Sequence, residues 1–340
     1  MKKIKLMVLF SIFLAGGILI MTSVQCAQNS RLKKSVVQET PLEKIPFNGT
    51  QAHKYIEELC MIGPRPSGSE GMRKQQAYLE AHFKKYGATV LYQRFNYRHP
   101  ENGTPVPCAN MIIRWEPERK ERLLLAAHYD TLPLALLDHP APKAPFLGAN
   151  DGGSGVAVLM EMAKEIPEIL KNHQQKYGVD FVMLDAEEFM FRPHGRFCVG
   201  SEYFARQYAA TDPKVAKKNK VTAREFSYRW AVLLDMVGDV DLEIKKERNS
   251  WKWRDSRPLL DEIWGIAEEL GVKEFSSKVT QNPILDDHVM LHNVGKIPTI
   301  DIIDMEYVWW HTSQDTADKC SPLKLARVGW VVTEWVKRVK

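Results

Sequence analysis

Four short apolar runs divide the chain, at 123–127, 179–184, 230–234 and 297–303. Each run is continuous rather than alternating, which is typical of strands that are buried on both faces. Apolar residues recur with helical spacing at 71–86, 154–170, 257–270 and 323–335, and two further strands are expected at 89–97 and 110–115. Alternating strands and helices predict one α/β domain, with a central, mostly parallel, mixed β-sheet flanked by helices.

The first 26 residues have a different pattern. Lys2, Lys3 and Lys5 precede an uncharged, mostly apolar run at 6–21, and small and polar residues follow. This is the layout of an export signal. A retained membrane anchor is the alternative, although the run is short for a full span. Residues 27–45 lack a hydrophobic period, so we expect a flexible tether there and the catalytic domain at 46–340.

Cys26 stands at the end of this signal and is a candidate for the lipid-modified cysteine of a bacterial lipoprotein. Gln25 before it fits such processing poorly, so ordinary cleavage is the alternative. We therefore expect an exported bacterial protein, either periplasmic or tethered to the membrane through the signal or a lipid on Cys26. In an oxidising compartment the other four cysteines are compatible with one or two disulfides.

The formal charge bears on binding to nucleic acid and to membranes. Residues 1–26 hold three lysines and no acids, so their removal lowers the net charge from +5 to +2. A charge this small gives no basis for binding nucleic acid, or for strong electrostatic binding to membranes.

Acids and histidines gather in five short motifs, most of them at the end of an apolar run. They are His-Tyr-Asp at 128–130, Asn-Asp-Gly-Gly at 150–153, Asp-Ala-Glu-Glu at 185–188, Leu-Asp-Met-Val-Gly at 234–238 and Trp-Trp-His-Thr at 309–312. A sheet of this class binds ligands beyond the carboxyl ends of its strands, where most of these motifs fall. Three such side chains with an open fourth position make a catalytic zinc site. The pattern predicts a zinc enzyme.

Each motif also has an ordinary structural interpretation. His128 could be structural, Asp151 could belong to a turn before a helix, and Asp235 could cap a helix. The acids at 185–188 favour a site, because clustered acids after a buried strand repel each other unless a cation or proton intervenes. One of the paired glutamates can then bind metal while the other acts as a base. Asp130 could orient the imidazole of His128.

The loop at 131–149 holds four prolines and no clear period. It is either a stiff surface connection or a rim over the site, since long loops in compact domains are often functional.

In this order, the motifs resemble the superfamily of zinc-dependent aminopeptidases and glutaminyl cyclases, over roughly residues 50–340. The resemblance implies Glu187 as general acid/base and metal ligands at His128, Asp151, Glu188, Asp235 and His311. Aminopeptidases of the superfamily use two zinc ions, bridged at the position of Asp151, and a bound water as nucleophile.

Two features favour the cyclase branch. Trp310 matches the tryptophan that lines the cyclase substrate pocket, and Asp286 matches an acid that shares hydrogen bonds with the equivalent of Asp235. Two carboxylates this close are expected to share a proton, which makes Asp235 a poor metal ligand. The resemblance then implies one zinc on Asp151, Glu188 and His311, with Glu187, Asp235 and Asp286 catalytic. His128 and Asp130 remain as candidates to support these ligands or to hold a second metal.

The chain departs from the cyclase pattern at two places. Many cyclases carry a second pocket tryptophan after the paired glutamates, and here Phe189, Phe191 or Phe197 would replace it. Asp301 stands where animal cyclases have histidine.

The sequence therefore predicts a glutaminyl-peptide cyclotransferase, which turns the N-terminal glutamine of peptides or proteins into pyroglutamate and releases ammonia. A two-zinc aminopeptidase acting on peptide N-termini is the main alternative. A non-catalytic binding ectodomain is a third alternative. Such a module would be expected to have lost metal ligands or the base, and none of them is missing here.

Overall fold

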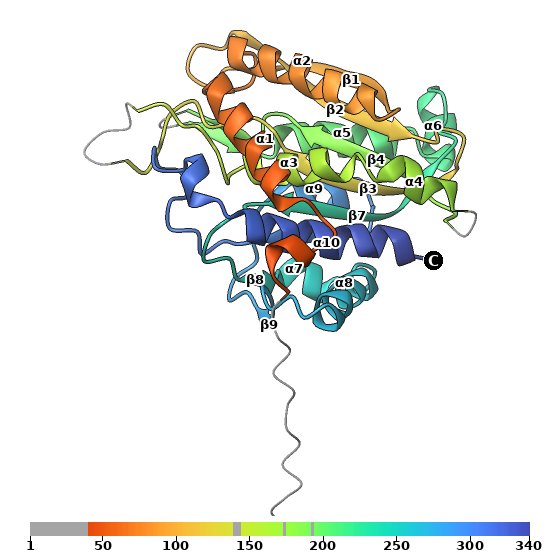
Figure 1. Cartoon of the computed structure of the whole chain (residues 1–340). Helices are drawn as coiled ribbons and strands as arrows, with labels where there is room; N and C mark the ends of the chain where they lie inside the picture. The colour runs from red at the N-terminus through yellow and green to blue at the C-terminus, as the bar shows by residue number, and fades with distance from the viewer. Residues whose placement is uncertain (1–39, 139–143, 173–174, 192–193) are drawn as a thin grey trace, which may run out of the picture. The chain divides into compact units, whose positions relative to one another are not determined.

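The computed structural model describes residues 40–138, 144–172, 175–191 and 194–340. Within them, the main β-sheet has six strands (Figure 1). In spatial order these are β1 (Thr89–Arg98), β2 (Pro105–Trp115), β4 (Gly178–Leu184), β3 (Glu121–His128), β7 (Ser227–Asp235) and β10 (Thr299–Ile303). The last four run parallel to one another, whereas β2 pairs antiparallel with both β1 and β4. The predicted α/β class with a mostly parallel mixed sheet is confirmed.

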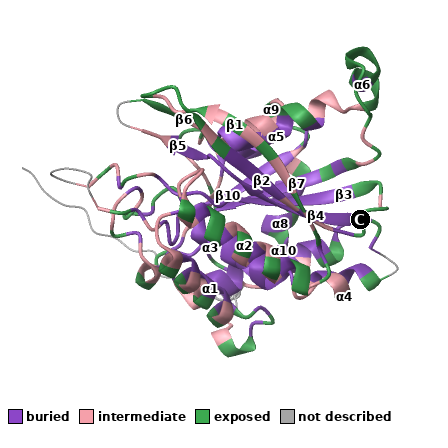
Figure 2. Ribbon diagram, turned by 90° about the horizontal axis from the view of Figure 1, so that it is seen from above, coloured by how far each residue is buried: buried purple, intermediate pink, exposed green. Residues whose placement is uncertain are grey.

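Helices cover both faces of this sheet (Figure 2). One layer contains α1 (Gly49–Ile62), α2 (Glu70–Lys85), α3 (Gly153–Met162), α4 (Ile166–Lys171), α8 (Arg257–Glu269) and α10 (Pro322–Arg338), and the other contains α5 (Val199–Ala210) and α9 (Asp287–Asn293). In β3, Leu123 and Leu125 belong to the core of the first layer, while Leu124 belongs to that of the second. Both faces are therefore apolar, which explains why the strand is a continuous hydrophobic run.

Two predicted elements differ from the structure. The expected helix at 154–170 is divided into α3 and α4, and Pro167 lies in the first turn of α4, where its missing N–H costs nothing. Strand β2 begins at Pro105, five residues earlier than expected. It pairs with β4 only from Met111 onward. Pro105 and Pro107 precede this point, so they lie outside the ladder between β2 and β4.

Several short elements were not predicted, because three to seven residues carry no readable period. They are α6 (Pro213–Asn219), α7 (Arg248–Lys252), the pair β5 (Glu188–Met190) and β6 (Gly195–Phe197), the pair β8 (Ile244–Lys246) and β9 (Phe275–Val279), and two 3₁₀ turns at Leu42–Lys44 and Ala317–Lys319.

The beginning of the folded unit lies inside the segment that was expected to be a tether. Leu42 packs against the main core and Ile45 is buried in it. The predicted export signal and Cys26 lie outside the described residues. Among the residues that are described, no helix combines the length and apolarity needed to cross a membrane.

The described cysteines are all free thiols: Cys60, Cys108, Cys198 and Cys320. Cys108, Cys198 and Cys320 are buried. The one or two disulfides that were considered from the sequence are therefore not formed among these four residues.

Candidate functional site

The carboxyl ends of the parallel strands bring the motifs to one edge of the sheet. His128 is the last residue of β3 and Asp235 is the last residue of β7, while the acids at 185–188 follow β4. Because β3 lies between β4 and β7, the side chain of His128 is placed between the two acidic groups. The strand connections change direction here, which is where ligands bind in open α/β sheets.

Asp151, Glu188 and His311 form a first group of possible metal ligands. One ligand atom from each lies within 4.8 Å of the others, and all three residues are buried. His311 Nε2 is 2.9 Å from Glu188 Oε1 and 3.7 Å from Asp151 Oδ2. Asp151 Oδ2 and Glu188 Oε2 are buried and have no hydrogen-bond partner among the residues that the structure describes. Two orphaned carboxylate oxygens beside an imidazole are the donor set that zinc takes, so the residues fit a zinc ion.

His128, Asp151 and Asp235 form a second such group. His128 Nε2 lies 3.0 Å from Asp151 Oδ1 and 3.2 Å from Asp235 Oδ1. Asp151 belongs to both groups and offers a different oxygen to each. The residues therefore fit one metal ion, or two that share Asp151.

The backbone around these ligands is unusual. Ala186, Met236 and His311 have φ values of 59°, 47° and 59°, in the left-handed region that non-glycine residues rarely adopt. Gly152 has φ 78°, and a Cβ there would lie 2.8 Å from Cε1 of His128. Backbone strain of this kind persists only where the surrounding structure enforces it, and it clusters at functional sites.

Asp130 does not orient His128 through a hydrogen bond. Its Oδ1 lies 3.8 Å from His128 Nδ1, which is too long for one. Instead, its two oxygens accept hydrogen bonds from the backbone N–H groups of Glu187 and Glu188, at 3.1 and 3.0 Å. Asp130 therefore fixes the turn that carries both glutamates.

Asp315 was missed by the sequence reasoning. It is completely buried and accepts hydrogen bonds from the backbone N–H groups of Asn150 and Asp151, at 2.9 and 3.1 Å, and from the hydroxyl of Tyr307. Burial and the nearby Asp151 raise its pKa to about 7. Asp315 thus fixes the turn that carries Asp151, in the same way that Asp130 fixes the turn that carries Glu187 and Glu188. Its place four residues after His311 is the only signal that could have pointed to it.

Glu187, Cys198 and Asp286 lie together beside the first group, with one polar atom of each within 4.8 Å of the others. The Cys198 thiol donates a hydrogen bond to Glu187 Oε1 at 3.3 Å. Burial and Glu188 raise the pKa of Glu187 well above its ordinary value. Burial and then Asp235 raise the pKa of Asp286 to about 7, the direction expected when two acids share a proton. Asp286 Oδ2 is buried and has no partner among the described residues.

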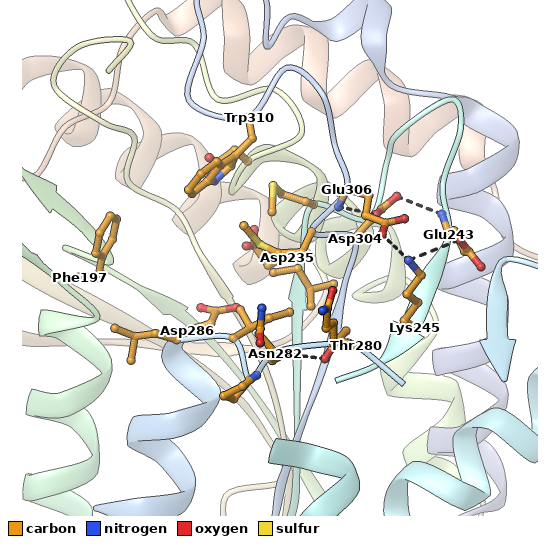
Figure 3. Close-up of a pocket in the computed structure, with 18 of the residues that line it drawn as sticks. Phe197, Asp235, Glu243, Lys245, Thr280, Asn282, Asp286, Asp304, Glu306 and Trp310 are labelled. Carbon is orange, nitrogen blue, oxygen red and sulfur yellow. Dashed lines mark hydrogen bonds and ion pairs between the residues drawn. The ribbon is translucent and has the colours of Figure 1, made fainter. Parts of the chain in front are cut away.

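A cavity of about 640 Å³ opens over these groups (Figure 3). Trp310 and Phe197 line it, and both rings lie parallel to the imidazole of His311, with centroids at 3.8 and 6.2 Å. Phe189 is buried and packs on Phe191. Of the three phenylalanines considered from the sequence, Phe197 is therefore the one at the cavity.

The loop at 131–149 lies beside this site, in the parts of it that are described. The N–H of Leu137 donates to the carbonyl oxygen of His311 at 3.0 Å, and the ring of Phe146 lies 6.2 Å from the imidazole. The loop therefore contacts the segment that carries His311, which agrees with its interpretation as a rim.

Comparison with known proteins agrees with this geometry. The model for peptidase family M28 matches residues 110–336. The crystal structure of Fimbriiglobus ruber glutaminyl cyclase is 36% identical with a TM-score of 0.78, covering 87% of this chain and 96% of that one. Bacteroides thetaiotaomicron glutaminyl cyclase is 30% identical with a TM-score of 0.75, covering 86% and 99%. Aminopeptidase YwaD of Bacillus subtilis is 25% identical over 84% of this chain, which spans only 56% of the length of YwaD.

Proposed function

The chain belongs to peptidase family M28, within the superfamily of zinc-dependent aminopeptidases and glutaminyl cyclases, and we propose that it is a glutaminyl cyclase. Its substrates would be peptide or protein N-termini that begin with glutamine. If the signal at 1–26 directs export, these substrates lie outside the cytoplasm. The observation that carries the proposal is that Asp286 is buried and lines the same cavity as Asp235, where an acid that shared a proton with Asp235 would leave it a poor ligand for a second metal.

Asp151, Glu188 and His311 would hold a zinc ion, and a zinc ion bound there would supply Lewis-acid polarisation of the side-chain carbonyl of the substrate glutamine. Glu187 would accept a proton from the α-amine of the substrate. The freed nitrogen then forms a bond to the side-chain carbonyl carbon. The same carboxyl returns the proton to the amide nitrogen, whose bond to that carbon breaks and which leaves as ammonia. The raised pKa of Glu187 suits a group that both takes and returns a proton.

The other residues would position the reacting groups. Asp235, beside Asp286, would accept hydrogen bonds from the amine, and the rings of Trp310 and Phe197 would flank the glutamine side chain. Because the nucleophile belongs to the substrate itself, much of the acceleration should come from this positioning.

A two-zinc aminopeptidase is the second candidate, and the complete group of His128, Asp151 and Asp235 is the observation that favours it. There, Glu187 would activate a water molecule rather than the substrate amine. The two functions differ in their products and in their metal content.

The test is mass spectrometry of the purified zinc-loaded protein with two peptides that differ only in their first residue, glutamine or leucine. Loss of one ammonia from the glutamine peptide alone supports the cyclase. Removal of whole residues from either peptide supports the aminopeptidase. A Glu187→Gln variant should keep its zinc and lose turnover, whereas loss of zinc would make Glu187 a ligand and contradict its role as base.

A further inference from the structure

Cys198 is held against the turn that carries Glu187. Its N–H donates to the carbonyl oxygen of Glu187 at 3.0 Å, and the N–H of Val199 donates to the carbonyl oxygen of Ala186, also at 3.0 Å. Cys198 has a φ of 60°, in the left-handed region, where glycine or asparagine would cost less. The thiol lies 3.3 Å from Glu187 Oε1. It therefore has a fixed place beside the proposed base.

Asp286 completes a group of three with Glu187 and Cys198, which we call the thiol site. One polar atom from each residue lies within 4.8 Å of the other two. Asp286 is only 4% exposed, and its Oδ2 has no hydrogen-bond partner among the described residues. A buried carboxylate oxygen without a partner is costly unless a proton or a cation meets it. The thiol site therefore offers one sulfur and two carboxyl groups, and none of its own members carries a positive charge.

The spacing and the donor atoms of the thiol site suit a divalent metal ion. A sulfur and an oxygen bound to one zinc ion, at about 2.3 and 2.1 Å, lie roughly 3.6 Å apart when the coordination is tetrahedral. The 3.3 Å between Cys198 Sγ and Glu187 Oε1 is close to this value. Thiolate sulfur prefers soft ions, whereas carboxylates and water alone suit calcium and magnesium. The sulfur of Cys198 therefore favours thiophilic ions such as zinc and cadmium.

An ion can reach the thiol site through the catalytic cavity. Glu187 and Asp286 both line this cavity, and Asp286 is seen at its wall in Figure 3. Asp286 also lies within 4.8 Å of polar atoms of His288 and Asp301, but these two residues are completely buried. Cys198 is completely buried as well. An ion that enters from the cavity therefore meets the two carboxyl groups first and then the thiol.

We propose that the thiol site binds a thiophilic divalent cation in addition to the zinc expected on Asp151, Glu188 and His311, and that this additional ion inhibits the enzyme. On binding, a sulfur–metal bond forms and the S–H bond of Cys198 breaks, and its proton passes to solvent. The ion also binds the carboxylate of Glu187, which can then no longer accept a proton. Because Glu187 is the base in both candidate functions, the inhibition is the same whichever of them is correct.

The first experiment titrates the zinc-loaded protein with cadmium, which absorbs in the ultraviolet when a thiolate is bound to it. Both metals are then measured by mass spectrometry. We expect one cadmium ion per chain with this absorption, and the zinc retained. Cys198→Ser should lose the absorption and bind cadmium at least about tenfold more weakly, since even a supporting group around a metal contributes that much to affinity. Cys60→Ala, which removes the partly exposed thiol, should behave like the wild type. Thermal unfolding verifies that both variants are folded.

The second experiment follows turnover during the same titration, on whichever peptide the protein converts, the one beginning with glutamine or the one beginning with leucine. Cadmium should inhibit the wild type and Cys60→Ala over the concentrations at which the absorption appears. Calcium at the same concentrations should not inhibit, because it has little affinity for sulfur. The cadmium concentration for half inhibition, taken against each variant's own cadmium-free rate, should rise at least about tenfold in Cys198→Ser.

Three results would overturn the thiol site. One is the absence of thiolate absorption in the wild type, or absorption that persists in Cys198→Ser. Another is inhibition of equal strength in the wild type and Cys198→Ser, which would place the inhibiting ion elsewhere, for example on His128, Asp151 and Asp235. The third is loss of one zinc for each cadmium gained, which would mean replacement of the catalytic ion. None of them alters the choice between cyclase and aminopeptidase, which the reaction product decides.

Discussion

The Nε2 atom of His288 lies 3.2 Å from an oxygen of Glu247, and both side chains are completely buried. The other ring nitrogen lies 3.2 Å from Asp301 Oδ2. Asp301, His288 and Asp286 in turn have polar atoms within 4.8 Å of one another. A buried chain of titratable side chains therefore leads from Glu247 to Asp286 at the catalytic cavity. It approaches the proposed site from inside the protein.

Glu247 fixes one end of this chain. Its oxygens accept hydrogen bonds from the backbone N–H groups of Asn249, Ser250 and Ile284, at 2.8, 2.7 and 3.1 Å. Burial alone would raise its pKa, but His288 and these N–H groups outweigh burial and lower the pKa to about 2.

Glu247→Gln should therefore destabilise the protein in a pH-dependent way. A carboxyl whose pKa is lowered on folding stabilises the protein above its unfolded pKa of about 4.3, and this contribution is lost as the pH falls towards 2. At pH 7 we expect a loss on the order of 3 kcal/mol in the free energy of unfolding. The difference from wild type should shrink between pH 5 and pH 2.5. Urea unfolding at several pH values measures it, with Glu70→Gln, at an exposed ion pair, as the control. A difference that stays constant with pH would rule out this account.

His288→Gln tests whether the buried chain positions Asp286. The substitution removes the imidazole that lies between Glu247 and Asp301. A small displacement of a positioned group can reduce turnover about 100-fold, so kcat should fall strongly while KM and the zinc content change little. His292→Gln is the matched control, because His292 lies on the same helix α9 but is paired with Asp255 near the surface. If kcat is unaffected in a folded His288 variant, the chain is structural only.

Among the described residues, the thiol of Cys198 is the one group that donates a hydrogen bond to the side chain of Glu187. Burial and then Glu187 raise the pKa of the thiol well above its ordinary value, so it stays protonated and able to donate. Cys198→Ala should lower kcat about fivefold to tenfold, because an ordinary hydrogen bond contributes about 1 kcal/mol. Cys198→Ser should recover much of the loss, because a hydroxyl also donates. Cys60→Ala removes a thiol elsewhere and serves as the control. Equal activity of the alanine and serine variants would contradict the role of this hydrogen bond.

The strands and the edge at which the motifs meet could be predicted from the sequence because both depend on local patterns. Buried strands are continuous apolar runs, and the residue that follows such a run lies at the strand's end. His128 and Asp235 were located in this way. The resemblance added which of these side chains are expected to bind metal.

The supporting contacts could not be predicted, because they join segments that are far apart in the chain. Asp315 binds the N–H of Asp151 across 164 positions, and nothing in the local sequence of either residue encodes that approach. Asp130 was expected to orient His128, yet it binds the backbone of Glu187 instead, since β3 and β4 are neighbours in the sheet. Part of the cavity wall comes from β8 and β9, which are too short to show a period.

Metal content separates the two candidate functions at the level of single residues. The purified protein should hold one zinc ion per chain, measured by mass spectrometry of the metal after dialysis. Asp151→Asn should lose it, because both groups of ligands include Asp151. Asp235→Asn should retain it and lose turnover if Asp235 is engaged with Asp286. Two zinc ions in the wild type, with one lost in Asp235→Asn, would instead identify the aminopeptidase arrangement.

The same variants should differ in thermal stability. Zinc that binds only the folded chain stabilises it by about 4 kcal/mol when its concentration is a thousand times the dissociation constant. Chelation should therefore lower the melting temperature of the wild type and of Asp235→Asn, while Asp151→Asn should not respond. A chelator response that persists in Asp151→Asn would place the stabilising metal elsewhere. This readout needs no substrate, so it tests the ligand assignment independently of the reaction.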